Sequence, residues 1–546
     1  MEDTRAKELC RIGNALFSKK QPWDSLCQDI ADNYYPMRSD FTRELTLGDD
    51  FCTNLMESYP VQAREMLGNA PSAMLRQGDW FEIKTGREEI DDAPGPARWL
   101  EYATKRYRRL VYDRRAKFTA ATIEVDHDWV AFGNGVMSVE ESPTRDHMLF
   151  RPWHPKNCAW MISEVGTVDH LQRNMKKTAR NLKKIYKDKV HSDIKTAATL
   201  DPSKEFNCRH IVLSTDEIYG DDKAMRRKYA KFPFLSIYMD MDHEQILGEA
   251  GLPVFNYVVP RWRTLSNFPQ GFSPATINSL PDGRMIQQMA RIILEQGEKA
   301  VDPPTVAKGA MFRDAVNMYA GGMTYVDLEA DDDIRKLFQT IETGNVSMGL
   351  EMKNDVRSML AEAFLLNKLF LPDTREMTAY ETSQRVAEFR RAALPFFGPI
   401  ESEYHLPLLD AGFQIALHNR QFDLGEMPDE LQGEEVTFTF ESPLNTAEGR
   451  ALVSAFQESV QIIAAGAQYD QTLPATMDLQ KMTKDAVKGT GAPADWFKDE
   501  DQATADQDQQ KQVQGLTQAA AALNDASMVG KNVADASVAL QQAGLQ

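Results

Sequence analysis

The clearest long helix in the sequence is PDGRMIQQMARIILEQGEKAVDPP, residues 281–304. Its apolar residues return at helical spacing, at Met285, Met289, Ile292 and Ile293. The helix should stop at Asp302-Pro-Pro304, because proline cannot donate the backbone hydrogen bond that the next turn requires. Helical spacing resumes over 346–370. Two long helices thus flank the insert 302–345, a shape that does not suit a compact catalytic core.

The insert and the loop after the second helix complete an elongated hairpin. The insert contains Tyr319-Ala-Gly-Gly-Met-Thr-Tyr-Val326, two short apolar segments around a Gly-Gly turn signal, which favours a small α/β structure. The loop after the second helix reads Leu369-Phe-Leu-Pro-Asp-Thr-Arg-Glu-Met-Thr378. A further helix should open at Thr378-Ala-Tyr-Glu381, which has the spacing of a capping box.

The remaining parts predict a mixture of helices and a mainly antiparallel sheet. A helix pair should precede Pro36, and Pro60 and Pro71 should interrupt the helix of 54–76. Other predicted helices are 97–132 (one or two), 168–187, 404–422 and 447–465. Predicted strands are 135–140, 147–153, 210–213, 234–240 and 435–440. The fold class is therefore α+β.

Composition limits the possible partners. The 546 residues include 62 Lys plus Arg against 81 Asp plus Glu, a net charge of -19. Such a balance argues against wrapping duplex DNA, although it allows DNA as a guest in a channel. The five cysteines have no paired spacing and are expected to be reduced thiols of a protein made in a cytosol. We expect neither a signal peptide nor a membrane partner, since no apolar run approaches a membrane span.

Motifs for catalysis are weak. A phosphate loop ending in Gly-Lys-Ser/Thr is missing, and Gly133-Asn-Gly135 and Gly489-Thr-Gly491 are better interpreted as turns. Asp126-His-Asp128 could bind a metal, as could His154 with Cys158, but nothing completes either ligand set. We therefore expect no catalytic residue, no metal and no cofactor. The alternative is a metal-dependent DNA-processing enzyme that uses Asp126, Asp128 and a further carboxylate.

The order of several short motifs resembles the portal, or head-to-tail connector, proteins of podovirus-type bacteriophages. No single motif is diagnostic, but their order and spacing extend over most of the chain. The motifs are Val259-Pro-Arg-Trp-Arg263, Gly271-Phe-Ser-Pro-Ala275, Ser279-Leu-Pro-Asp282, Glu298-Lys-Ala-Val-Asp-Pro-Pro304, Met377-Thr-Ala-Tyr-Glu381, Gly398-Pro399 and Phe440-Glu-Ser-Pro-Leu444.

The resemblance implies a non-catalytic ring, usually of twelve subunits, at one capsid vertex of the virion. The protein would be made in the host cytoplasm and would conduct double-stranded DNA without reading its sequence. Implied partners are the terminase large subunit, tail adaptor proteins, and capsid and scaffolding proteins. The implied domains are the wing (1–272 and 379–441), two stem helices (273–301 and 346–368), a clip (302–345), a tunnel loop (369–378), a crown (442–498) and a Gln/Ala-rich tail (499–546), either a barrel or disordered.

The resemblance also implies positions for functional residues. Tunnel-loop or DNA-facing candidates are Lys368, Asp373, Thr374, Arg375 and Glu376. Stem residues that could touch the DNA backbone are Arg284, Arg291 and Lys353, for which ion pairs between neighbouring stem helices are the alternative. Clip residues that could contact terminase are Arg313, Asp314, Tyr319 and Tyr325. A capsid or tail scaffold protein remains a third hypothesis.

Overall fold

The computed structural model describes most of the chain up to residue 487. The described residues are 2–46, 48–53, 55–76, 79–91, 93–142, 144–216, 227–266, 268–308, 319–326, 338–340, 346–366, 398–433, 436–440, 447–466, 482–483 and 486–487. The chain divides into two compact units. The first contains Met1–Phe81, Arg106–Phe422 and Phe440–Asn445, and the second contains Glu82–Lys105, Asp423–Thr439 and Thr446–Gln546.

The first unit begins with one long helix, α1 (Glu2–Tyr34). The expectation of a helix pair is wrong, because the chain stays helical through Pro22. That proline lies on the exposed side, so water can reach the backbone group that loses its partner. The buried side is continuous across it, through Leu9, Trp23, Cys27, Ile30 and Tyr34.

Three further helices of this region follow the predicted pattern with one correction. They are α2 (Tyr59–Leu75), α4 (Pro94–Val111) and α5 (Phe118–Phe132). The predicted interruption of α2 is wrong, since Pro60 occupies its first turn, where proline is tolerated, and Pro71 lies inside the helix. The prediction of one or two helices within 97–132 is confirmed, with two helices, α4 and α5.

A five-stranded antiparallel sheet has the order β4-β5-β6-β7-β8. Its strands are β4 (Cys158–Ile162), β5 (Val168–Thr178), β6 (Glu205–Ser214), β7 (Phe234–Asp240) and β8 (Gln245–Leu252). The predicted strands 210–213 and 234–240 are confirmed as parts of β6 and β7. The sheet is therefore mainly antiparallel, as the sequence indicated.

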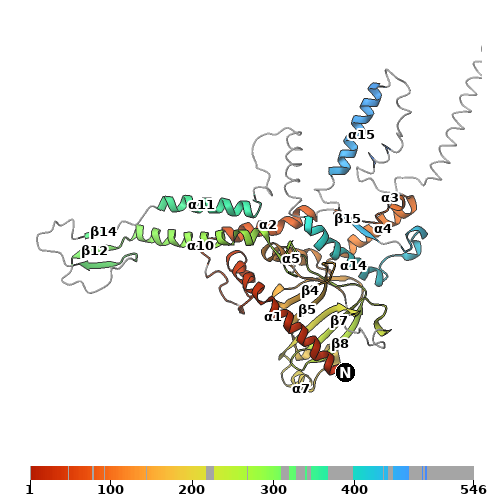
Figure 1. The fold of residues 1–546 in the computed structure, drawn as a ribbon, viewed down its shortest axis with the longest axis horizontal. Coiled ribbons are helices and arrows are strands. Elements are labelled where there is room, and N and C mark those ends of the chain that lie inside the picture. Colours follow the sequence, from red (N-terminus) through yellow and green to blue (C-terminus); the bar gives the residue numbers. More distant parts are fainter. Residues whose placement is uncertain are drawn as a thin grey trace, which may run out of the picture. The chain divides into compact units, whose positions relative to one another are not determined.

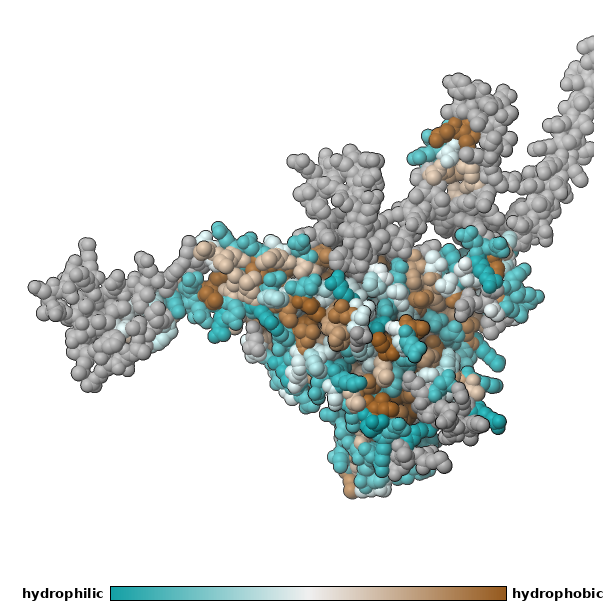
Figure 2. All heavy atoms as spheres, viewed as in Figure 1, coloured by the Kyte–Doolittle hydropathy of each residue, from teal (hydrophilic) through white to brown (hydrophobic). Residues whose placement is uncertain are grey.

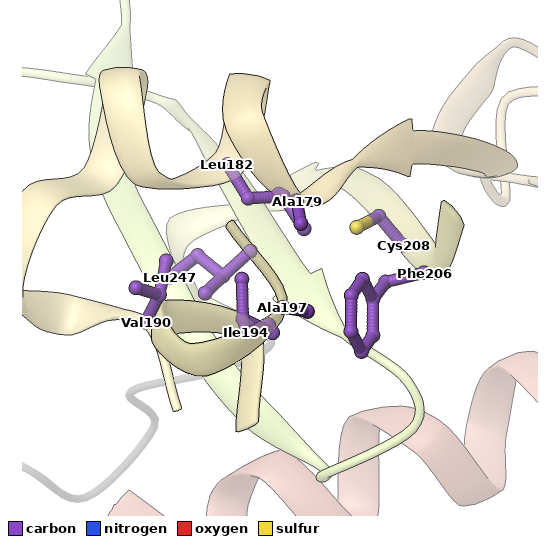
Figure 3. Packing of buried hydrophobic residues seen from close by; sticks show 8 residues of the cluster. All are labelled: Ala179, Leu182, Val190, Ile194, Ala197, Phe206, Cys208 and Leu247. Atoms are coloured by element: carbon purple, nitrogen blue, oxygen red, sulfur yellow. The ribbon is translucent and has the colours of Figure 1, made fainter. Parts of the chain in front are cut away.

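Helices pack on both faces of this sheet (Figure 1). On one face, α1 packs through Ala6 and Leu9 against Ile211 and Leu213 of β6. On the other face lie α6 (Ala179–Tyr186) and α7 (Ser192–Leu200). Their apolar side chains meet Phe206 and Cys208 of the same strand in one buried cluster (Figure 3). Alternate residues of β6 thus serve opposite cores, as the pleat of a strand requires.

The helix predicted over 168–187 is wrong in its first part, where the chain forms β5. Strands β4 and β6 pair with β5 on its two sides and satisfy its backbone groups, which outweighs the helical appearance of this lysine-rich stretch. The helix starts only at Ala179, where the Thr178 hydroxyl accepts a hydrogen bond from the Asn181 amide at 3.4 Å. Pairing with distant strands has overridden the local pattern.

Small elements complete this unit. A three-stranded sheet orders as β3-β2-β9, and β10 pairs with β11. The bounds are β2 (Met137–Glu141), β3 (Met148–Pro152), β9 (Tyr257–Val258), β10 (Arg263–Thr264) and β11 (Gly271–Phe272). Helical pieces are η1 (Pro36–Arg38), η2 (Pro155–Asn157), η3 (Lys187–Lys189), a π-helical turn (Glu401–His405) and α14 (Leu406–His418). The predicted strands 135–140 and 147–153 are confirmed as β2 and β3.

Two helices, α10 (Pro274–Val301) and α11 (Val346–Ala363), run side by side (Figure 1). The Ser273 hydroxyl caps α10, and the helix ends before Asp302 as predicted. In the sequence, the segment between α10 and α11 contains β12 (Thr305–Lys308), β13 (Met323–Val326) and β14 (Phe338–Thr340). These strands form a sheet of order β13-β12-β14. The prediction that helix continues to residue 370 is wrong at Leu365, whose φ of 58° is left-handed.

The second unit holds the described parts of the C-terminal region. Its elements are α3 (Glu88–Asp91), η6 (Leu424–Glu426), η7 (Asp429–Leu431) and α15 (Ala447–Gly466), with the start of α4. The strands β1 (Phe81–Lys84) and β15 (Thr437–Phe440) pair in a two-stranded sheet. The predicted strand 435–440 and helix 447–465 are confirmed. In the described part of the chain, every helix is too short or too polar to cross a bilayer.

Candidate functional site

The paired helices α10 and α11 are tied together near their midpoints by a short segment before α2. The Gln287 side chain of α10 binds this segment with both of its polar atoms. Its Oε1 accepts hydrogen bonds from the amides of Met56 at 2.7 Å and Glu57 at 2.9 Å. Its Nε2 donates to the Glu57 carbonyl oxygen at 2.9 Å. Both polar atoms of this amide side chain thus bind residues 56–57.

The Glu57 carboxylate then reaches the second helix. It accepts from Lys353 Nζ at 2.9 Å and from Arg357 Nη2 at 2.5 Å, and its side chain is only 9% exposed. Burial alone would raise the pKa of Glu57, but the two cationic donors lower it below its ordinary value. We call Gln287, Glu57, Lys353 and Arg357 the base bracket. It joins α10 to α11 through groups that are distant in sequence.

The N-terminal half of α10 packs against α1. The buried Tyr34 hydroxyl donates to the Ser279 carbonyl oxygen at 2.5 Å, and the Tyr34 ring lies 5.4 Å from that of Phe364. Burial raises the pKa of Tyr34, so the hydroxyl keeps its proton and remains a donor. A Cβ at Gly283 would lie 2.5 Å from the Tyr34 oxygen. Glycine is therefore required where the two helices cross.

The chain segment leading into α10 is held by Asn134. Its Nδ2 donates to the Gly271 carbonyl at 2.7 Å, while its Oδ1 accepts from the Gly271 amide at the same distance. Gly133 ends α5 with a φ of 73°, and a Cβ there would lie 2.2 Å from the Phe272 carbonyl carbon. The interpretation of Gly133-Asn-Gly135 as a turn is confirmed.

The predicted stem cations all have carboxylate partners within the chain. Arg284 pairs with Asp29 of α1, and Arg291 pairs with Glu295 one turn along α10 at 3.1 Å. Their side chains remain 55% and 63% exposed. Lys353 is different, since it is 17% exposed and belongs to the base bracket. Each of the three cations thus binds a different carboxylate.

Most of the other predicted site residues lie outside the described residues. This holds for Lys368, Asp373, Thr374, Arg375, Glu376, Arg313 and Asp314, and for the capping box 378–381. Tyr319 is described, with an exposed side chain in the turn before β13. Tyr325 lies in β13.

Away from the base bracket, the helix pair exposes apolar side chains. Figure 2 shows this apolar surface over α10 and α11. On α11, Met348, Met352 and Met359 recur at intervals of four and seven residues and share one exposed face. On α10, Met285, Ile292 and Leu294 are exposed. We call Met285, Ile292, Met348, Met352 and Met359 the helix-pair surface; Leu294 lies about 200° around α10 from Ile292 and is not part of it.

Comparison with known sequences identifies the family of this chain. The sequence model of the family described as "Bacteriophage head to tail connecting protein" matches residues 6–497. The chain belongs to this family. It is also similar to the "Portal protein" of Salmonella phage epsilon15, with 23% identity over 483 residues that cover 86% of this chain and 84% of that protein. The expected resemblance to portal and head-to-tail connector proteins is confirmed.

Two solved structures are similar over long stretches at low identity. One is the neck of an empty GTA particle, with 10% identity, a TM-score of 0.35, and coverage of 73% of this chain and 86% of that chain. The other is the virion of a native gene transfer agent particle, with 12% identity, a TM-score of 0.32, and coverage of 80% and 95%. TM-scores this low do not establish a shared arrangement.

In this connector-family chain, each side chain of Asp126-His-Asp128 contacts an arginine. Asp126 pairs with Arg76, and Asp128 accepts from Arg38 at 3.0 Å. His127 accepts from Arg64 at 2.7 Å, and burial together with that guanidinium lowers the pKa of His127 to about 4. The two carboxylates therefore bind different partners instead of converging on one site. Together with the family, this points to a structural connector.

The second predicted ligand pair, His154 with Cys158, also has its own surroundings within the fold. His154 Nε2 lies 2.7 Å from a carboxylate oxygen of Asp40, and Cys158 is buried at the start of β4. Burial raises the pKa of the Cys158 thiol to about 11, which disfavours the thiolate that a metal requires.

Sequence reasoning missed the base bracket. Its one local signal was Gln287, a polar residue whose buried neighbours on α10 are Gly283, Ile286 and Ala290. A buried amide needs partners, so this position could have been marked as a contact point. Nothing in the sequence shows that the partner is Glu57, which is 230 residues away.

Proposed function

We propose that this chain assembles as a ring of twelve subunits at one vertex of a phage capsid. Double-stranded DNA would pass through the ring during packaging and ejection, without sequence readout and without catalysis. The ring would dock the terminase large subunit, tail adaptor proteins, and capsid and scaffolding proteins. The chain would therefore reside in the virion after synthesis in the host cytoplasm.

The observation that supports this proposal most is the helix-pair surface. Five apolar side chains on α10 and α11 are exposed in the single chain, while the base bracket and Tyr34 hold the half of the pair that contains the N-terminal half of α10. An exposed apolar face on a rigid support is typical of an interaction surface. In a closed ring, a neighbouring copy of the chain covers such a face on every subunit.

The charge of the chain supports sliding of DNA over tight binding. Twelve copies, each with a net charge of -19, would mostly repel phosphate, which keeps a duplex mobile in a channel. Arg284 and Arg291 could still touch the DNA backbone, since both guanidinium groups are exposed beside their partners. Lys353 is better assigned to the base bracket, because Glu57 already binds it.

The domain assignment is part of the proposal. Segments 273–301 and 346–368 would form the stem, and 302–345 would be a clip that meets terminase through Arg313, Asp314, Tyr319 and Tyr325. The loop 369–378, with Lys368 before it and Asp373, Thr374, Arg375 and Glu376 within it, would narrow the channel. The wing would comprise 1–272 and 379–441, the crown 442–498, and the tail 499–546.

Negative-stain electron microscopy of the purified chain tests the proposal. We expect rings with a central hole, and native mass spectrometry should give a single species with the mass of twelve subunits. Monomers at high concentration would contradict the assembly, and shells or tubes would support the scaffold hypothesis instead. Metal-dependent DNA cleavage that disappears in Asp126→Ala would contradict the non-catalytic role.

A further inference from the structure

Two histidines and an aspartate meet at one end of the five-stranded sheet. His191 precedes α7 as its N-cap, Asp193 lies in the first turn of α7, and His243 lies in the turn between β7 and β8. One ligand atom from each residue lies within 4.8 Å of the other two. The imidazole rings stack with centroids 4.0 Å apart, and His243 Nε2 is 3.4 Å from an Asp193 carboxylate oxygen. Among the described residues, these are the three His, Cys, Asp or Glu side chains that lie close enough together to hold one metal ion.

A fourth residue orients one of these histidines. Asp240 ends β7 fully buried, and its carboxylate oxygen lies 2.6 Å from His243 Nδ1. This contact places the proton of a neutral His243 on Nδ1, so the lone pair of Nε2 points away from Asp240 and toward Asp193. A carboxylate behind a histidine is the arrangement that orients histidine ligands in metal sites and increases their basicity.

The packing beneath holds both supporting elements in place. Ile194 and Ala197 of α7 are buried against Phe206 and Leu247 of the sheet (Figure 3). At the β7–β8 turn, the Gln245 side chain donates to the Lys189 carbonyl just before α7 at 3.0 Å. The N-terminal turn of α7 and the β7–β8 turn are therefore fixed relative to each other, which lowers the cost of bringing the ligands together.

We propose that His191, Asp193 and His243 bind one divalent transition metal ion, with Zn²⁺ the best match to two imidazoles and a carboxylate. Metal–ligand distances of about 2.1 Å in a tetrahedral site separate ligand atoms by about 3.4 Å. The ligand atoms all lie within 4.8 Å of one another, and they reach that value by a rotation of the side chains that also unstacks the two imidazole rings. The side chains of His191 and Asp193 are 40% and 68% exposed, so they have room to rotate. The ion and a water ligand can also enter from the solvent at this exposed site. The ion would link α7 to the β7–β8 turn.

Metal titration of the full-length chain tests this site. The protein is stripped with a chelator, dialysed and titrated with Zn²⁺ by calorimetry, with bound zinc counted by elemental analysis. We expect one high-affinity ion per chain. Affinity should fall at least tenfold in His191→Ala and in His243→Ala. Co²⁺ in place of Zn²⁺ should give the visible absorption of a tetrahedral site, and this band should disappear in both variants.

His147 provides a matched control. Like His243, its side chain is 18% exposed and its Nδ1 lies 2.6 Å from an aspartate oxygen, that of Asp146. Zinc binding should be unchanged in His147→Ala. Asp240→Asn should weaken binding about 10- to 100-fold through the orientation of His243, with circular dichroism confirming that each variant folds. Equal affinity in the wild type, His191→Ala and His243→Ala would overturn the proposal, as would a wild-type chain that binds no zinc. Either result leaves the ring proposal untouched.

Discussion

The five-stranded sheet and the helix pair α10–α11 use apolar residues in opposite ways. The sheet is covered on both faces, by α1 on one and by α6 and α7 on the other, and its clusters are buried within one chain. The helix pair is held over the half that contains the N-terminal half of α10, and it exposes Met285, Ile292, Met348, Met352 and Met359. The sheet region buries its apolar clusters within the single chain, whereas the helix pair leaves apolar side chains exposed among the described residues. Substitutions in the two regions should therefore affect different measurements.

The largest effect on folding should come from the sheet core. Leu182→Ala removes a fully buried side chain of α6 and leaves a cavity against β6 and β8, which should lower the free energy of unfolding by about 2–5 kcal/mol. Urea unfolding of the chain measures this. Leu200→Ala is the control, because Leu200 at the end of α7 is 80% exposed and its loss should change stability by less than about 0.5 kcal/mol. Similar losses for both leucines would contradict the picture of a closed core.

The next largest effect on folding should come from the contact between α10 and α1. Gly283→Ala would place a Cβ 2.5 Å from the Tyr34 oxygen and force α1 and α10 apart, at a cost of about 1–3 kcal/mol. Gly297→Ala in the same helix is a close control, since its Cβ would meet nothing within 4 Å. That substitution should stabilise by up to about 1 kcal/mol through helix propensity. If both changes destabilise equally, α10 is packed along its whole length.

A smaller effect is expected in the base bracket. Glu57→Gln removes the charge that binds Lys353 and Arg357; because those two side chains are 17% and 38% exposed, the expected loss is about 1–2 kcal/mol, less than for a fully buried pair. Glu295→Gln, which breaks the exposed pair with Arg291, should change stability by less than about 0.5 kcal/mol. Thermal unfolding of both variants and the wild type provides the comparison.

The stability difference between the wild type and Glu57→Gln should depend on pH. The pKa of Glu57 is lower in the folded chain than in the unfolded one, so its contribution is complete above the unfolded-state pKa of about 4.3. It is lost as the pH falls from there through the lowered folded-state pKa. The stability difference between the wild type and Glu57→Gln should therefore shrink in acid. A difference that stays constant down to pH 3 would show that the charge of Glu57 does not matter.

The smallest effect on folding is expected at the helix-pair surface. Met352→Glu together with Met359→Glu places charges on an exposed face of α11, so the stability of the monomer should change by less than about 0.5 kcal/mol. Under the ring proposal, the same change should abolish assembly in size-exclusion chromatography and microscopy. Val165→Glu is the control, since Val165 is 85% exposed in the sheet region and should leave rings intact. Intact rings in the methionine variant would show that another surface makes the contact.

The sequence predicted the features that depend on neighbouring residues. The end of α10 at Asp302 follows from two prolines, and the course of α15 follows from its apolar spacing. The order of motifs was enough to identify the family, because each motif is read without knowledge of the fold. Strand β5 was missed because its structure depends on pairing with β4 and β6, which its own lysines do not indicate.

The candidate site was less predictable than the fold. Arg284 and Lys353 were candidates for contact with the DNA backbone, with ion pairs between stem helices as the alternative; each side chain meets a carboxylate from a distant part of the chain, Asp29 or Glu57. Such pairings are set by how α1 and the segment before α2 approach the helices. The same reasoning explains Pro22, whose tolerance in α1 depends on which side of the helix faces water.

The base bracket also has a mechanical consequence. Because residues 56–57 bind α10 through Gln287 and α11 through Lys353 and Arg357, a small rotation at this point turns both helices as one lever. From Gln287 to the end of α10 at Val301 the helix rises about 21 Å. A tilt of about 10° at the bracket therefore carries the far end by about 4 Å, comparable to the rise of almost three helical residues. A motion of the segment before α2 would thus be amplified along α10 toward β12, which follows it in the chain.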